Sequence, residues 1–108
     1  MSRNALGEFE HHVMLALVRL GGRADGPHVV LELEAVTGRS VSPAAVFIAL
    51  RRLEQRGYAR SSKREPQPGE GGRGRRVFQV SAAGQAKLRA SRTTFERLWD
   101  TGPVTGTW

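Results

Sequence analysis

Apolar residues recur every three or four positions through three successive segments of the chain, the spacing of helices that bury one face. The first segment, residues 5–20, ends at a pair of glycines. The second begins near Asp25, a suitable N-cap, has Pro27 in its first turn, and closes at Gly38. The predicted buried stripes are Leu6, Phe9, Val13, Met14, Ala16, Leu17 and Leu20 in the first helix, and Val29, Val30, Leu33 and Val36 in the second.

The third apolar segment has the clearest start signal. Ser42 is a good N-cap, Pro43 suits the first helical position, and Gly57 is a good stop. A turn at residues 38–41 joins this helix to the preceding one, so the two short helices resemble a helix-turn-helix pair. The stripe that this helix is predicted to bury consists of Val46, Ala49, Leu50 and Leu53.

After the third helix the pattern changes to that of strands. Residues 58–64 alternate loosely, and residues 77–80 are rich in β-branched and aromatic side chains, so each segment predicts a short strand. Residues 65–74 between them are rich in Pro and Gly and predict the long tip of a β-hairpin. Ser81 is then expected to cap a last helix that runs to about Asp100.

The order helix, helix, helix, strand, loop, strand, helix is that of a winged helix-turn-helix with an added C-terminal helix. The predicted fold class is therefore mainly α with a small β-hairpin. We expect a winged helix-turn-helix DNA-binding domain over residues 1–80, a C-terminal dimerisation helix over residues 81–100, and a flexible tail over residues 101–108.

Positive charge is concentrated in one quarter of the chain. The net charge is +7 over 108 residues, and residues 51–76 carry nine Lys or Arg against three acids. Residues 1–50, by contrast, carry four Arg against five acids. A local basic patch is typical of a protein that binds a polyanion, although a solvated charged face is the alternative interpretation.

Composition argues against several other classes of protein. Apolar residues make up 39% and charged residues 25%, as in ordinary soluble domains. No apolar run approaches the ~20 residues that cross a bilayer, and the N-terminal segment is not a signal-peptide stretch. The chain contains no cysteine, which excludes disulfides and thiolate sites. We expect a cytoplasmic protein without a membrane partner.

Candidate chemistry for catalysis or metal binding is sparse. His11 and His12 are adjacent, so on a helix they point in different directions, and Glu8 with His12 is only a pair. These histidines are interpreted as surface or dimer-interface residues. No nucleophile–base–acid set and no phosphate-binding loop motif is present. We therefore expect no metal, no cofactor and no enzymatic activity.

Three blocks of the sequence together resemble the PadR family of transcriptional regulators. They are LGEFEHHVMLALVRLGG at 6–22, SPAAVFIALRRLEQRGYAR at 42–60, and GGRGRRVFQVSAAGQAKL at 71–88. The length resembles the short members of the family, which have a single C-terminal helix. The resemblance implies a homodimeric repressor with its third helix in the major groove and its wing near the minor groove.

The resemblance also assigns roles to individual residues. Phe47 and Phe78 stand where the family usually has tyrosine, so neither position offers a hydroxyl here. Asp25 stands where an aromatic residue is common. The start of the recognition helix corresponds to Ser42, Pro43 and Ala44, and the basic wing to Gly72, Arg73, Arg75 and Arg76.

Arginines of the third helix and of the hairpin are the candidate DNA contacts. Arg51 and Arg52 can bind phosphate or guanine, or can form a solvated face paired with Glu54 or Glu8. The glycine-flanked wing arginines fit a DNA wing, a merely solubilising loop, or an RNA-binding segment. The predicted DNA-binding residues are Ser42, Pro43, Ala44, Phe47, Arg51, Arg52, Lys63, Arg64, Arg73, Arg75 and Arg76.

Phe95 and Trp99 lie four residues apart on one face of the last helix. They fit either an intramolecular core or a dimer interface with an aromatic-lined pocket for a small-molecule effector. The first hypothesis is thus a DNA-binding repressor dimer on a pseudo-palindromic operator, and the second is a winged-helix module that binds an acidic protein. The predicted dimer interface consists of Phe9, Leu88, Phe95, Leu98 and Trp99.

Overall fold

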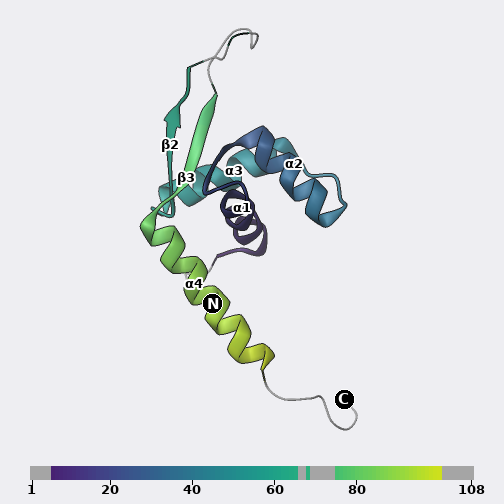
Figure 1. Cartoon of the computed structure of the whole chain (residues 1–108), viewed down its shortest axis with the longest axis vertical. Helices are drawn as coiled ribbons and strands as arrows, with labels where there is room; N and C mark the ends of the chain where they lie inside the picture. The colour runs from purple at the N-terminus through teal and green to yellow at the C-terminus, as the bar shows by residue number, and fades with distance from the viewer. Residues whose placement is uncertain (1–5, 66–67, 69–74, 101–108) are drawn as a thin grey trace.

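Four helices and three strands form the chain in the computed structural model, which describes residues 6–65, 68 and 75–100 (Figure 1). The predicted mainly helical fold with a small β-hairpin is confirmed. Arg73, Gly72 and the predicted tail over residues 101–108 lie outside the described residues. The elements are α1 (Glu8–Arg19), β1 (Arg23–Asp25), α2 (Gly26–Thr37), α3 (Pro43–Gln55), β2 (Ala59–Lys63), β3 (Arg76–Val80) and α4 (Ala82–Trp99).

Three helices begin where the sequence predicts an N-cap. The Asp25 carboxylate accepts a hydrogen bond from the His28 amide at 2.9 Å, and the Ser42 hydroxyl accepts one from Ala45 at 3.2 Å. The Ser81 hydroxyl accepts the Gly84 amide at 3.0 Å. Each side chain satisfies a backbone donor that the first helical turn leaves without a partner, and so fixes where the helix starts.

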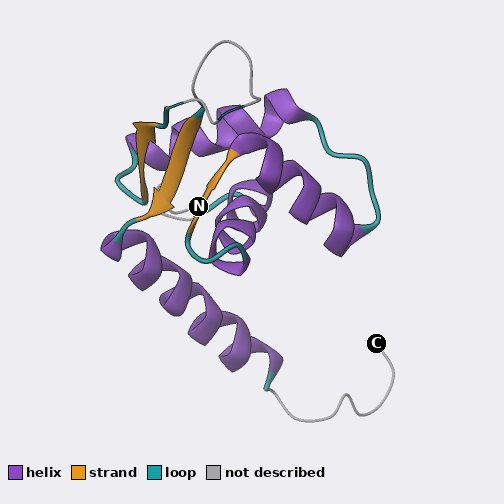
Figure 2. Ribbon diagram, turned by 45° about the horizontal axis from the view of Figure 1, so that its top comes forward, coloured by secondary structure: helices purple, strands orange, loops and turns teal. Residues whose placement is uncertain are grey.

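The sheet has one strand more than the predicted hairpin. β1 pairs with β3 in antiparallel fashion, and β3 pairs with β2, so β3 is the central strand of the order β1-β3-β2 (Figure 2). β1 has only three residues, too few to show alternation, and its hydrogen bonds come from a strand more than fifty residues away. The prediction of a two-stranded hairpin was therefore incomplete.

The core lies where α1, α2 and α3 meet one face of the sheet. The predicted stripe of α3 is fully buried, whereas Val36 of α2 is 56% exposed and Phe9 of α1 is 38% exposed. Val36 lies in the last turn of α2, where it lines an open groove between α1 and α2 together with Leu15. Expected burial of Val36 was therefore wrong. The core cluster consists of Val13, Met14, Ala16, Leu17, Val29, Val30, Leu33, Val46, Ala49, Leu50, Leu53, Ala59, Phe78 and Val80.

α4 begins against the core and then leaves it (Figure 1). Gly84 is buried beneath β2 and β3, and Leu88 is partly buried against the core cluster. Farther along, the Phe95 ring stacks on His11 of α1 at 5.9 Å between centroids. Every residue from Arg92 to Asp100 is exposed, so the second half of α4 has little support from its own domain.

Gly84→Ala should destabilise the fold, because a Cβ at this position would lie 2.1 Å from the carbonyl oxygen of Tyr58. We expect a loss of about 1–3 kcal/mol, the range for overpacked sites, measured by thermal or urea unfolding. Gly26→Ala is the matched control, since a Cβ there meets no atom within 4 Å. An unchanged melting temperature for Gly84→Ala would contradict this packing of α4.

Candidate nucleic-acid interface

The N-terminal half of α3 presents a continuous exposed surface. Ser42, Pro43 and Ala44 are all exposed, as a recognition helix requires, and Phe47 and Ile48 are 49% and 51% exposed. The Phe47 ring lies edge-on to Phe78 of β3 at 6.3 Å between centroids. One edge of Phe47 thus joins α3 to the sheet while the other remains open to a ligand.

Arg51 and Arg52 are both exposed on α3. Arg51 forms an ion pair with Glu54 at 3.2 Å, as the solvated-face interpretation expects. Glu54 in turn accepts hydrogen bonds from the amide and hydroxyl of Ser61, which ties β2 to α3. An exposed ion pair contributes about 0–1 kcal/mol, so Arg51 can exchange Glu54 for a phosphate at little cost.

Strand alternation divides the predicted basic residues of the hairpin between two faces of the sheet. Lys63 pairs with Arg76 across the β2–β3 ladder, and Arg76 donates a hydrogen bond to the Ser61 hydroxyl at 2.9 Å. Cross-strand partners share a face, so Lys63 and Arg76 lie on the face that packs against α3. Arg64 and Arg75, each one residue away, belong to the opposite face, which we call the outer face.

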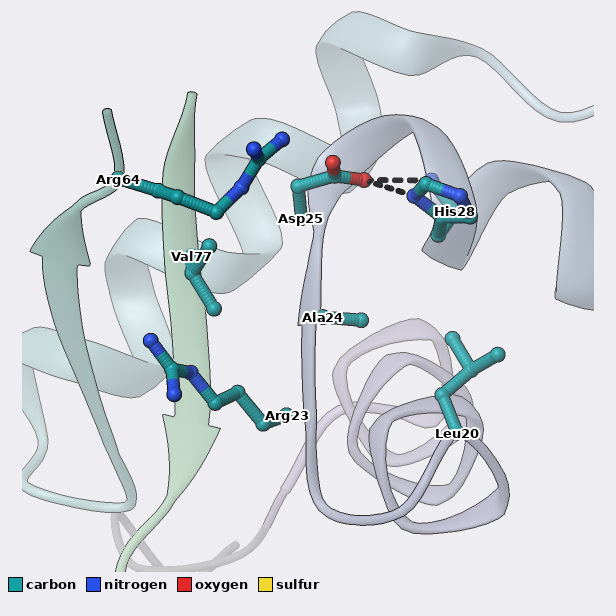
Figure 3. A pocket seen from close by; sticks show the side chains of 7 residues that line it. All are labelled: Leu20, Arg23, Ala24, Asp25, His28, Arg64 and Val77. Carbon is teal, nitrogen blue, oxygen red and sulfur yellow. Dashed lines mark hydrogen bonds and ion pairs between the residues drawn. The ribbon is translucent and has the colours of Figure 1, made fainter. Parts of the chain in front are cut away.

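Asp25 is the buried carboxylate at the edge of the outer face (Figure 3). It is 5% exposed, accepts hydrogen bonds from the amide and the Nδ1 of His28, and lies 3.8 Å from Arg75. Burial raises the pKa of Asp25, but these hydrogen bonds and the charges of His28 and Arg75 outweigh it and hold the pKa below its ordinary value. Asp25 therefore carries a negative charge that links α2 to the base of the wing.

The predicted dimer residues differ in their surroundings. Leu88 packs against its own core, whereas Phe95, Leu98 and Trp99 are 61%, 67% and 89% exposed. Burial and the neighbouring His12 lower the pKa of His11, beside Phe95. Within the described part of the chain no three His, Cys, Asp or Glu side chains form a metal-binding cluster, and no helix is long and apolar enough to cross a membrane.

Sequence reasoning missed two basic residues of the outer face. Arg23 was assigned to no element because β1 was not predicted, and Arg60 lies in a segment that alternates only loosely. The period-two pattern of β2 and β3 could have separated the arginines by face, because neighbouring residues of a strand point to opposite sides.

No family model and no curated protein matches the sequence, but solved structures do. A PadR family transcriptional regulator from Eggerthella lenta DSM 2243 is similar at a TM-score of 0.66 and 26% identity, over 82% of this chain and 74% of that chain. A PadR-like transcription factor from Bacteroides fragilis is similar at a TM-score of 0.74 and 18% identity, over 86% and 84%. A winged-helix DNA-binding protein from STIV is similar at 0.68 and 13%, over 92% and 100%.

The fold therefore defines a winged-helix protein of the kind found in DNA-binding regulators. PadR-family transcriptional regulators are among its structural neighbours, in agreement with the resemblance seen in the sequence.

Asp25 generates a prediction for acid stability. A carboxyl whose pKa is lowered by folding stabilises the protein above its unfolded pKa, near 3.9, and that stabilisation is lost as the pH falls through the folded value. Asp25→Asn should keep the cap but be less stable than the wild type at pH 7, with the difference shrinking below about pH 4. Asp25→Ala also loses the cap and should cost about 1 kcal/mol more at every pH. Urea unfolding from pH 3 to 7 measures both, and a pH-independent difference for Asp25→Asn would contradict the charge link.

Proposed function

We propose that the protein is a transcriptional regulator that binds DNA sequence-specifically as a homodimer and represses the genes whose operators it binds. The observation that carries this proposal is the exposed start of α3, together with the position of Lys63 and Arg76 on the side of the sheet that packs against α3. A helix fits the major groove of B-DNA, about 12 Å wide, while cations beside it hold the phosphates. Repression rests on the resemblance to PadR regulators.

Within this interface some residues are assigned to the bases and others to the phosphates. Ala44 and Phe47 lie toward the start of α3, where recognition helices approach base edges, and both are apolar side chains suited to a thymine methyl group. Arg51 of α3 and the strand residues Lys63 and Arg76, which lie on the α3 side of the sheet, are assigned to the phosphates. The α3 face would thus combine sequence discrimination with the charge needed for affinity.

A homodimer is supported by the apolar stripe at the end of α4. Phe95, Leu98 and Trp99 lie three and four residues apart and are exposed together, more apolar surface than one small domain leaves open without a partner. A second copy that covers this stripe would place two α3 helices about 34 Å apart, one turn of duplex, on a pseudo-palindromic operator.

An effector site remains a prediction of the same arrangement. A hollow of about 270 Å³ lies between α1 and α4 beside the Phe95 ring, with His11 and Lys87 among its lining residues. Its lining combines apolar side chains with the polar groups of His11, Lys87, Ser91 and Thr94, which suits a small aromatic molecule with polar substituents held near the dimer contact.

Lys63→Ala with Arg76→Ala should weaken binding to specific and random duplexes alike, because these side chains are assigned to phosphates. The log–log dependence of affinity on salt should become shallower by roughly 0.9 for each lost phosphate contact, about four contacts per dimer. Fluorescence anisotropy at several salt concentrations measures this slope. Arg89→Ala with Arg92→Ala removes the same charge from exposed positions of α4 and should leave the slope unchanged. A salt-independent affinity of the wild type would contradict DNA binding.

Phe95→Asp with Trp99→Asp should split the dimer, because two charges would be buried at the proposed interface. We expect the mass of a monomer in light scattering, with the melting temperature of the winged helix retained. Leu31→Asp with Val18→Asp places two charges on other exposed apolar positions and should leave the mass unchanged. A wild type that is monomeric at tens of micromolar would overturn both the interface and the palindromic operator.

A further inference from the structure

The outer face of the sheet carries a second cluster of arginines that the α3 interface does not use. We propose that this face binds the phosphate backbone of a second DNA duplex, so that one protein can hold two DNA segments at once. This inference rests on the proposed DNA-binding function, and it assigns to the protein a contact surface on the side of the sheet away from α3.

The register of the sheet places these arginines together. Arg23 pairs with Gln79, and Gln79 pairs with Arg60 on the other side of β3, so the three side chains share one face. The amide of Arg64 donates to the carbonyl of Arg75 at 2.7 Å, which continues the same face toward the wing. Phe78, on the opposite face, is 1% exposed and points into the core, so the outer face must point away from it.

The side chains of Arg23 and Arg64 lie over β3 and run in opposite directions, with the end of Arg64 beside Asp25 (Figure 3). Figure 3 shows Arg23 extending from β1 and Arg64 from the end of β2, with Val77 of β3 between them. Their aliphatic stems help to cover Val77, which is 7% exposed, and bring the charged ends to the surface. The cleft around these side chains has a volume of about 540 Å³.

Charge on this face is strongly unbalanced. Among the described residues this face carries four arginines, Arg23, Arg60, Arg64 and Arg75, and one acid, Asp25. Arg64 and Arg75 also have other partners, so Arg23 and Arg60 carry the charge that the strands offer to a ligand. Asp25 is buried and accepts two hydrogen bonds from His28, so its negative charge also stabilises the first turn of α2. Guanidinium groups bind phosphate oxygens through two parallel hydrogen bonds, which makes such a cluster suitable for a phosphodiester backbone.

The surface chemistry favours DNA over an acidic protein. Within the three strands as described, the exposed residues of the outer face are Arg23, Arg60, Ser62 and Gln79, with Arg75 next to β3. The one apolar side chain of that face within these strands, Val77, is covered. Protein interfaces need an apolar or aromatic centre, whereas protein–DNA interfaces are polar, wet and positively charged. The exposed side chains of the outer face are polar or positively charged, so this face resembles the protein side of a protein–DNA interface.

The partner must be a second segment because the two binding faces point in opposite directions. Lys63 and Arg76 lie on the side of the sheet that packs against α3, and the outer-face arginines lie on the other side of the same single layer. A straight duplex seated on α3 cannot pass around the sheet to touch both sides. The outer face is thus available to another duplex, or to a distant part of the same one.

A capture assay tests this proposal. A duplex fixed to beads is loaded with the full-length protein and washed, and a fluorescent second duplex of random sequence is added. Arg23→Ala with Arg60→Ala should load the first duplex within about twofold of the wild type but capture about tenfold less of the second, because the lost charges lie on the outer face. Arg89→Ala with Arg92→Ala, which removes the same charge from exposed positions of α4, should capture as the wild type does.

The outcomes separate this inference from the proposed function. Failure of the wild type to load the first duplex would refute DNA binding itself. Normal loading without capture of the second duplex would overturn only the second surface, and so would capture of polyglutamate in place of DNA. Equal capture by the wild type and by Arg23→Ala with Arg60→Ala would overturn it as well, since bridging would then run through the α3 helices of two subunits.

Discussion

Burial of Phe78 is the constraint on which the rest of the sheet depends. This residue lies at the centre of β3, pairs with Ala24 of β1 on one side and with Ser61 of β2 on the other, and is 1% exposed. Because a shift of register by one residue would turn Phe78 to solvent, its burial determines which face every neighbour occupies. Arg76 and Lys63 consequently lie on the α3 side, and Arg75 and Arg64 on the outer side.

Phe78 also sets the position of the helix assigned to DNA. Its ring contacts Phe47 of α3 edge to face. The carboxylate of Glu54 on α3 accepts hydrogen bonds from the amide and the hydroxyl of Ser61 on β2. An apolar contact thus connects α3 to β3, and a charge-assisted contact connects α3 to β2. These contacts fix the position of α3 relative to the wing strands, so the exposed start of α3 and the strand cations form a rigid surface.

Asp25 provides the second link between the helices and the sheet. Its backbone belongs to β1, its side chain caps α2, and its charge reaches Arg75 at the base of the wing. A tyrosine or other aromatic residue at this position could pack against α1 but could not supply a charge. In this chain an electrostatic contact therefore connects α2 to the wing.

The sequence by itself determined the helices, their caps and the central strand, because these features depend on local spacing and on side chains that bond their own backbone. Asp25, Ser42 and Ser81 act as the caps their positions predicted, and the buried stripe of α3 is the predicted one. Only the tertiary structure decided that β1 exists, that Val36 stays exposed, and that neighbouring arginines of the hairpin separate onto two faces. The existence of β1 and the separation of the arginines depend on pairing with β3, whose register follows from the burial of Phe78. Val36 stays exposed because the last turn of α2 borders an open groove.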